Sequence, residues 1–265
     1  MCTIVTAFFD INRNTKGDGR TIEEYKIWIK NTLELNCNLF IVTEPKFENF
    51  IRTNRPDILL SKTYIYIINL TDSYYYKYYN EINQIINSIN YKQIIQNPDR
   101  IECILPEYNI IQYSKFYYLQ LAIKLNPFST KYFMWADIGI SRFFLDVDIN
   151  QEYPTTKGLQ ILDQSNNKLI IQNRADIHTF NIDNNFIWRS DNLLIGTMFG
   201  GTAEIINIIA ELIENLFINL IYNYKCVNNE QIALALVYIN NKDLFYLINN
   251  NTNYHLILFK LLSHI

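Results

Sequence analysis

The stretch Lys131-Tyr-Phe-Met-Trp-Ala-Asp137-Ile-Gly139-Ile-Ser-Arg142 indicates the fold around it. Four consecutive apolar or aromatic residues, Tyr132 to Trp135, are typical of a strand that is buried on both faces of a sheet. Asp137 follows this run almost directly, and Gly139 permits a turn or a close approach of the backbone. An acidic residue at the carboxyl end of a buried strand lies where open α/β sheets bind their ligands. Asp137 is therefore a candidate ligand for a divalent cation that bridges to a diphosphate, and the alternative is an aspartate that caps a turn.

The composition fits a protein with a large apolar core. Of the 265 residues, 49 % are hydrophobic and 18 % are charged, which is unlike a disordered chain. The net charge of −3 and the lack of a long basic block argue against nucleic acid as a partner. The four cysteines are far apart in sequence and have no zinc-binding spacing, so we expect reduced thiols.

No signal peptide is expected, because Met1 leads directly into an apolar run without a basic region or a cleavage site. The longest apolar segment, 205–221, is interrupted by asparagines and glutamates, so no transmembrane segment is expected. A cytoplasmic location is the expectation that follows.

The first half of the chain alternates apolar strands with amphipathic helices. Strands are predicted at 3–9, 38–43, 63–69 and 132–135. Helices are predicted to begin at Thr21, Glu44, Tyr78 and Tyr113. This β-α-β-α order predicts an α/β fold with a mostly parallel sheet and helices on both faces.

The second half is less regular. Residues 146–192 are rich in Asn, Asp and Gln and contain one clear strand at 169–172, which is typical of a variable region that faces a site. The remaining predictions are a strand at 192–198, a long helix from Thr202, a helix from Asn228 and a strand at 244–248. No repeat or linker divides the chain, so one domain over residues 1–265 is expected.

The end of the first strand is a candidate nucleotide site. Thr6-Ala7-Phe8-Phe9 could hold a base and ribose through backbone groups, with Arg13 or Lys16 on phosphate. The alternative is a core strand followed by a solvated loop. A P-loop or a GxGxxG fingerprint is absent.

Two further places could carry chemistry. In the segment Gly196-Thr-Met-Phe-Gly-Gly201, two adjacent glycines lie between a predicted strand and a helix, where a ligand could approach the backbone, and the alternative is a simple tight connection. Glu230 lies in the first turn of a predicted helix and could act as a base or position an acceptor. Its alternative role is to complement the helix dipole.

The sequence offers other candidates for metal binding. Asp146-Val147-Asp148 is a literal DxD, but it lies beyond the buried strand in less ordered sequence, so Asp137 is favoured. His255 could complete the coordination sphere of a divalent cation, and the alternative is a structural histidine.

Taken together, these segments resemble the HtrL/YibB family. The resemblance rests on Val5-Thr-Ala-Phe-Phe-Asp-Ile11 with Arg13, Ser114-Lys115, Asn126-Pro127-Phe128, Trp135-Ala-Asp137-Ile-Gly139 and Gly200-Gly201. The opening segment and Trp-x-Asp-x-Gly are its most specific pieces. That family looks like a branch of the GT-A nucleotide-sugar glycosyltransferases that is associated with the synthesis of cell-surface polysaccharides.

The resemblance implies a GT-A-like (Rossmann-like) fold, with a nucleotide-binding half at 1–142 and an acceptor-side half at 143–265. It implies transfer of a sugar from a UDP- or GDP-linked donor to a hydroxyl of a glycan or glycoconjugate acceptor, with Mn²⁺ or Mg²⁺ as cofactor. A non-catalytic protein that binds nucleotide-sugars or carbohydrates is the alternative. A third possibility is an interaction scaffold that binds no nucleotide.

The resemblance also implies roles for single residues. The first strand end and Arg13 would face the nucleotide, Lys115 would lie near the diphosphate, and Asp137 would bind the metal with His255. Gly200 and Gly201 would line the sugar, and Asn229-Glu230-Gln231 would lie on the acceptor side. The chain departs from the pattern in two places. Gly139 stands where a DxD has its second acid, and Asn229 stands where an acid is expected.

Lys115 lies near the start of the predicted helix that leads to the strand before Asp137. From that position, Lys115→Ala is expected to weaken donor binding without unfolding the protein.

Overall fold

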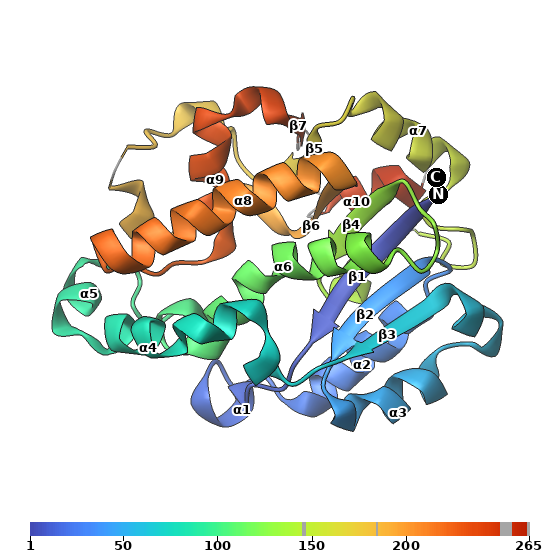
Figure 1. Ribbon diagram of the computed structural model, residues 1–265, viewed down its shortest axis with the longest axis horizontal. Helices are drawn as coiled ribbons and strands as arrows, with labels where there is room; N and C mark the ends of the chain where they lie inside the picture. Colours follow the sequence, from blue (N-terminus) through green and yellow to red (C-terminus); the bar gives the residue numbers. More distant parts are fainter. Residues whose placement is uncertain (145–146, 184, 250–255, 264–265) are drawn as a thin grey trace.

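The sheet predicted from the apolar runs is present in the computed structural model, which describes residues 1–144, 147–183, 185–249 and 256–263. Seven described strands form one sheet in the order β3-β2-β1-β4-β6-β5-β7 (Figure 1). Their bounds are Cys2–Phe8 (β1), Asn38–Thr43 (β2), Thr63–Ile67 (β3), Tyr132–Ala136 (β4), Leu169–Asn173 (β5), Leu194–Thr202 (β6) and Phe245–Ile248 (β7).

The sheet is mostly parallel, which confirms the predicted fold class. β1 pairs in parallel with β2 and β4, β2 with β3, and β5 with β7. β6 is antiparallel to both of its neighbours, β4 and β5, so among the described strands it alone runs in the opposite direction. The chain leaves β1 for β2 and β3 on one side and later places β4 on the other side. The ends of β1 and β4 therefore form the switch point at which open α/β sheets bind ligands.

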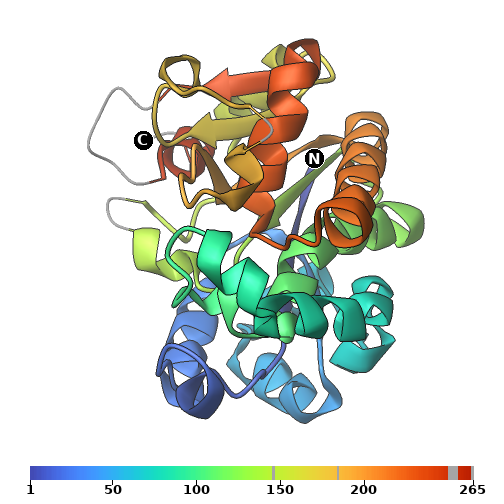
Figure 2. The same ribbon diagram turned by 90° about the vertical axis from the view of Figure 1, so that its left-hand side faces the viewer.

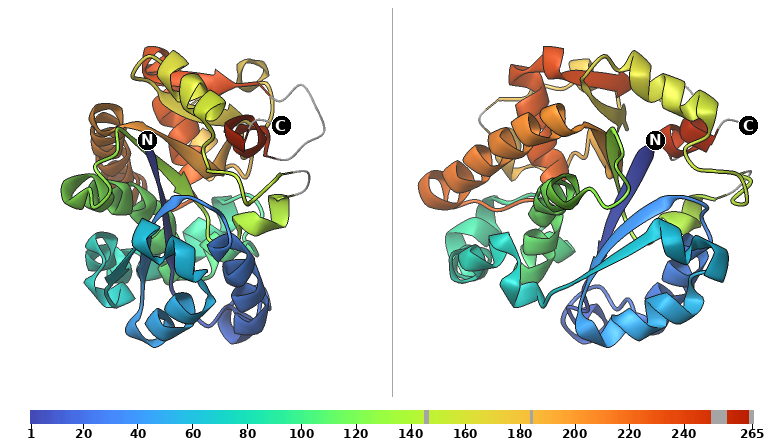
Figure 3. Two further views of the ribbon diagram at one scale, coloured as in Figure 1. Left: turned by 90° about the vertical axis from the view of Figure 1, so that its right-hand side faces the viewer. Right: turned by 45° about the vertical axis from the view of Figure 1, so that its right-hand side comes forward.

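Helices cover both faces of the sheet, also as predicted (Figure 3). Their bounds are Arg13–Lys16 (α1), Ile22–Leu33 (α2), Pro45–Asn54 (α3), Tyr79–Asn87 (α4), Ile89–Ile94 (α5), Pro106–Leu125 (α6), Thr156–Gln164 (α7), Ala203–Asn219 (α8), Glu230–Asn240 (α9) and Ile257–Ser263 (α10). One apolar core lies between the sheet and α4, α6, α8 and α9, and a second lies against α2, α3, α7 and α10. Within β1, Val5 and Ala7 belong to the first core and Ile4 and Phe8 to the second, because successive side chains of a strand point to opposite faces.

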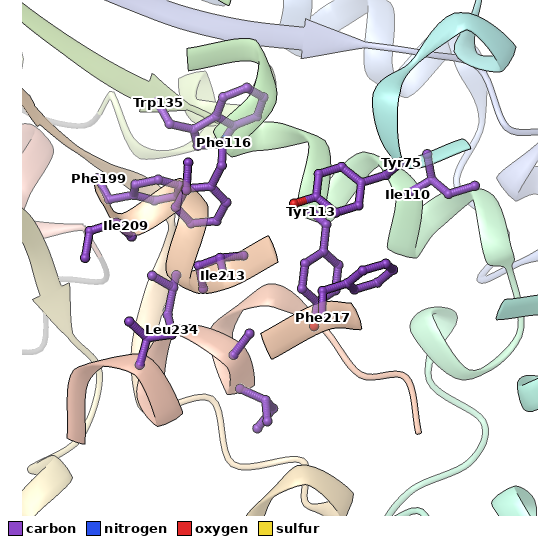
Figure 4. Close-up of a cluster of buried hydrophobic side chains, with 14 of the residues drawn as sticks. Tyr75, Ile110, Tyr113, Phe116, Trp135, Phe199, Ile209, Ile213, Phe217 and Leu234 are labelled. Carbon is purple, nitrogen blue, oxygen red and sulfur yellow. The ribbon is translucent and has the colours of Figure 1, made fainter. Parts of the chain in front are cut away.

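Aromatic side chains fix α6 across the centre of the sheet (Figure 4). The ring centroids of Tyr113 and Phe217 are 4.4 Å apart, and those of Phe116 and Phe199 are 5.1 Å apart. All four side chains are buried, and each such burial contributes about 1.5–3 kcal/mol to stability. Lys115 lies between Tyr113 and Phe116 in sequence, so this packing also holds its backbone in place.

The helix containing Lys115 begins earlier than predicted. α6 starts at Pro106 instead of Tyr113, since proline suits the first position of a helix, where its missing N–H needs no partner. It ends at Leu125 and is followed by Asn126, the C-cap, which adopts a left-handed conformation with φ 33°. The expectation that Lys115 lies near the start of the helix is therefore wrong, because Lys115 lies in its middle.

Two other predicted helices also differ. The helix predicted from Tyr78 is divided at Ser88, whose side chain accepts a hydrogen bond from the backbone N–H of Tyr91 and caps α5. In the polar region 146–192 the prediction missed α7. This short helix is capped by the side chain of Thr155 and buries Leu162.

Helix α8 packs beside α6 and α9 (Figure 2). With the π-helical turn Leu220–Tyr224 it is long and apolar enough to cross a membrane, and the described residues contain no other such helix. In the structure, Ile206, Ile209 and Ile213 are buried in the core shared with α6. Helix α8 thus supplies apolar side chains to the core, which accounts for its composition.

Candidate functional site

A cavity of about 250 Å³ opens at the carboxyl ends of β1 and β4, at the switch point of the sheet. Its walls are the segment after β1, the start of α2, one face of α6, the segment after β4, part of β6 and the first turn of α9. Residues from six segments of the chain therefore meet at one place.

Most of the predicted site residues line this cavity. They are Ala7, Phe8, Phe9, Arg13, Lys115, Asp137 and Glu230. Thr6 and Lys16 do not line it, because Thr6 is buried within β1 and Lys16 is exposed on α1. His255 and Asp146 lie outside the described residues.

Gly200 and Gly201 do not lie in the cavity, which corrects the prediction that they line a sugar. They belong to β6 itself, where they pair with Met134 and Phe133, at the end of β4 remote from Asp137. A Cβ at Gly200 would collide with the carbonyl oxygen of Phe133, so this glycine permits close strand packing. The prediction failed because β6 continues to Thr202, a length set by its pairing with β4.

Gly196, at the other end of the same strand, does line the cavity, although the prediction placed the ligand at the glycine pair of this segment. A Cβ at this position would collide with Oε1 of Glu230, so glycine allows the carboxylate of Glu230 to lie against the strand. The segment 196–201 therefore did indicate the site, but the glycine that lines the cavity is Gly196 and not Gly200 or Gly201.

Lys115 is the centre of a buried charge network. Its Nζ lies 2.6 Å from Oε1 of Glu230 and 3.0 Å from Oδ1 of Asp137, and it donates a hydrogen bond of 3.0 Å to the carbonyl of Gly196. These three partners match the three N–H groups of an ammonium. Its side chain is 3 % exposed, and burial lowers its pKa, but the two carboxylates outweigh burial and hold the pKa above its ordinary value.

Asp137 is fixed from several directions and remains accessible. Its backbone N–H donates to the carbonyl of Thr197 at 2.9 Å, and Nε1 of Trp135 donates to its Oδ1 at 2.8 Å. Its side chain is 34 % exposed, whereas that of Glu230 is 1 % exposed. Asp137 therefore joins the buried network to the open part of the cavity.

Glu230 is the first residue of α9, and Asn229 is the N-cap of that helix. Oδ1 of Asn229 accepts hydrogen bonds from the backbone N–H groups of Gln231 and Ile232, both at 3.1 Å. Asn229, which stands where the resemblance leads one to expect an acid, therefore serves as the N-cap of α9. Burial raises the pKa of the Glu230 carboxyl above its ordinary value, although Lys115 acts in the opposite direction.

Two buried acceptors in the cavity lack a hydrogen-bond donor. Oε2 of Glu230 and Oε1 of Gln112 have no partner among the described residues, and both side chains line the cavity. Burying a polar atom without a hydrogen-bond partner lowers stability by about 1–3 kcal/mol. A ligand or a water molecule that donates hydrogen bonds to these two oxygens would therefore stabilise the site.

Cationic side chains outnumber anionic ones around the cavity. The lining side chains include four cations (Arg13, Arg20, Lys115 and Arg142) and three anions (Asp10, Asp137 and Glu230), although the whole chain has a net charge of −3. Arg13 donates to the hydroxyl of Tyr25 at 2.7 Å, and its guanidinium lies 5.0 Å from the ring centroid of Tyr108. The arrangement favours a ligand that carries negative charge and an aromatic or apolar part.

The described residues do not fit a site for Mn²⁺ or Mg²⁺. These cations need several oxygen ligands, yet the ammonium of Lys115 already occupies the position between Asp137 and Glu230. No group of three or more His, Cys, Asp or Glu within the described ranges could hold a metal. Asp148, from the alternative DxD, is exposed and accepts hydrogen bonds from Asn150.

The fold and the cavity define an α/β protein with a polar, cation-rich site at the switch point of its sheet. The chain belongs to the HtrL_YibB family: the family model, described as "Bacterial protein of unknown function", matches residues 1–261. The resemblance inferred from the sequence is thereby confirmed.

Two solved structures are similar to the chain over most of its length. One is the apo form of mouse xyloside xylosyltransferase 1, with a TM-score of 0.45, 10 % identity, and coverage of 92 % of this chain and 84 % of that chain. The other is 4-diphosphocytidyl-2C-methyl-D-erythritol synthase from Anaerococcus prevotii, with a TM-score of 0.37, 9 % identity, and coverage of 96 % and 90 %. No curated protein matches the sequence.

Proposed function

We propose that the protein is a glycosyltransferase that moves a sugar from a UDP- or GDP-linked donor to a hydroxyl of a glycan or glycoconjugate acceptor. The observation that carries this proposal is the coexistence of two unpartnered buried acceptors and an excess of cationic side chains in one cavity. A sugar or ribose supplies hydroxyl donors, and a diphosphate supplies negative charge. A nucleotide-sugar combines these properties, and the switch point of the sheet suits it.

The segment after β1 is the natural place for the nucleoside. Ala7, Phe8 and Phe9 line the cavity beside Tyr25 and Tyr108, so a flat base would meet apolar and aromatic side chains there. The guanidinium of Arg13 lies next to both tyrosine rings and adds positive charge to this wall.

In the proposed reaction, the oxygen of the acceptor hydroxyl forms a bond to the anomeric carbon of the sugar. The bond between that carbon and the phosphate oxygen breaks, and the nucleoside diphosphate leaves with the electron pair. The hydroxyl proton passes to a base, for which Glu230 is the candidate because its raised pKa and free Oε2 suit proton acceptance. Lys115 is a positioning residue, since it holds the carboxylates of Glu230 and Asp137 together.

One observation favours the alternative of a binding protein without catalysis. Oε1 of Glu230 is engaged by the ammonium of Lys115, and this contact weakens the carboxylate as a base. Such a protein would bind nucleotide-sugars in the same cavity and transfer nothing.

The proposal is tested by thermal melts and turnover assays with UDP, GDP and their sugar conjugates, with and without Mn²⁺. A bound nucleotide at a hundredfold excess over its Kd should stabilise the protein by about 2.7 kcal/mol. Glu230→Gln should retain nucleotide binding and lose transfer. If no nucleotide shifts the melt, the proposal is wrong. Tight binding without turnover over hours, with a panel of glycan acceptors, would instead support the binding protein.

A further inference from the structure

Two arginines, Arg20 and Arg142, line the cavity and share one aromatic neighbour. Their guanidinium groups both lie against Trp28 of α2, 5.9 Å and 4.6 Å from its ring centroids. Arg142 is held by a hydrogen bond of 3.0 Å from its Nε to the carbonyl of Gly139, the residue at the position of the second acid of a DxD. The turn after β4 therefore places a cation where a metal-binding motif would place a carboxylate.

The charge of this pair is poorly balanced within the protein. Arg142 forms no ion pair with any described carboxylate, and Arg20 shares Asp18 with Arg13 at a distance of 3.4 Å. Partial burial and the neighbouring Arg20 both lower the pKa of Arg142 from its ordinary value. Two like charges that line one cavity, without a full set of counter-ions among the described residues, favour the binding of an anion there.

The position beside Asp137, where the resemblance implies a divalent cation, is already occupied by the ammonium of Lys115. Lys115 bridges Asp137 and Glu230 with contacts of 3.0 Å and 2.6 Å, so a metal would have to displace a buried ammonium that has all its hydrogen-bond partners. The positive charge that a leaving diphosphate requires must then come from other groups, and the two arginines that line the cavity can supply it.

We infer that Arg142 and Arg20 form a diphosphate site that works without a divalent cation. This inference rests on the proposed function, because it assigns the diphosphate of the nucleotide donor to these two side chains. The fork of a guanidinium matches two phosphate oxygens at once, so a pair of arginines can bind four of the oxygens of a diphosphate. Trp28 keeps both forks in position through its ring.

The test is calorimetric titration of the full chain with UDP, GDP and inorganic pyrophosphate, in EDTA and in Mn²⁺. Affinity in EDTA should equal that in Mn²⁺ within about threefold, a difference of less than 1 kcal/mol. Arg142→Gln should weaken pyrophosphate and nucleotide binding by about tenfold or more, as expected when a charged hydrogen bond is lost. Arg52→Gln is the matched control, because Arg52 is exposed on α3, pairs with Glu48 and with no other described carboxylate, and lies outside the cavity.

The outcomes separate this inference from the proposed function. If nucleotides bind only in Mn²⁺, and His255→Ala removes this Mn²⁺-dependent binding, the inference is overturned and the proposed function stands. If pyrophosphate binds in EDTA and depends on Arg142 while no nucleotide binds, the anion site stands and the proposed function fails. Equal affinity of Arg142→Gln and the parent protein for every ligand would also overturn the inference.

Discussion

At the scale of single residues, the cavity is organised by Lys115. It lies 115 positions before Glu230 and 22 before Asp137, so no local pattern in the sequence could show that the three side chains meet. The sequence identified all three as candidates, but it gave Lys115 a direct contact with the diphosphate. In the structure its three N–H groups are used by Glu230, Asp137 and Gly196, which leaves none of them for a direct contact with a diphosphate.

This network changes what is expected of a substitution at Lys115. Lys115→Met should lower the free energy of unfolding by about 3–5 kcal/mol, because it leaves the buried carboxylate of Glu230 without its cation. Adding Glu230→Gln to this variant should recover part of the loss, since an uncharged amide is easier to bury. Urea denaturation of the single and double variants measures both effects.

Lys124→Met serves as the control, because Lys124 is exposed near the end of the same helix. It should change the free energy of unfolding by no more than about 0.5 kcal/mol. A Lys115→Met protein as stable as the parent would show that the network does not stabilise the fold.

At the scale of elements, the sequence predicts the presence of the strands more accurately than the residues at which they end. Runs such as Tyr132–Ala136 are apolar along their whole length because both faces of the sheet are covered. The end of β6 was misplaced, since its last residues pair with β4 and β5, and pairing partners are not encoded in a local pattern. The start of α6 was misplaced because Pro106 is compatible with both a loop and the first turn of a helix.

The two ends of β6 provide a matched pair of substitutions. Gly200→Ala should lower the free energy of unfolding by about 1–3 kcal/mol, because its methyl group would meet the backbone of Phe133. Nucleotide affinity of the folded protein should not change. Gly196→Ala should displace the side chain of Glu230, so it should reduce transfer more than stability.

Chemical denaturation, nucleotide titration and a transfer assay on both variants separate the roles of the two glycines. Loss of nucleotide binding in folded Gly200→Ala, with normal binding and transfer in Gly196→Ala, would restore the original expectation that the glycine pair lines the ligand.

At the scale of the whole molecule, the order of strands decides where the site lies. β1 has β2 on one side and β4 on the other, and this places Ala7, Asp137 and the start of α9 around one cavity. The alternation of strands and helices in the sequence was sufficient to predict a parallel sheet and a site at its carboxyl edge. The antiparallel insertion of β6 between β4 and β5 was not predicted, although it brings Gly196 and Thr197 to the cavity.

The central claim is that this cavity is a nucleotide-sugar site, and the most direct measurement is a crystal structure after soaking with UDP- and GDP-sugars in EDTA. We expect density for the ligand at the carboxyl ends of β1 and β4. The diphosphate should lie on Arg142 and Arg20, and ligand hydroxyl groups should lie within hydrogen-bond distance of Oε2 of Glu230 and Oε1 of Gln112. A nucleotide bound elsewhere on the protein, with this cavity empty at saturating ligand, would contradict the claim.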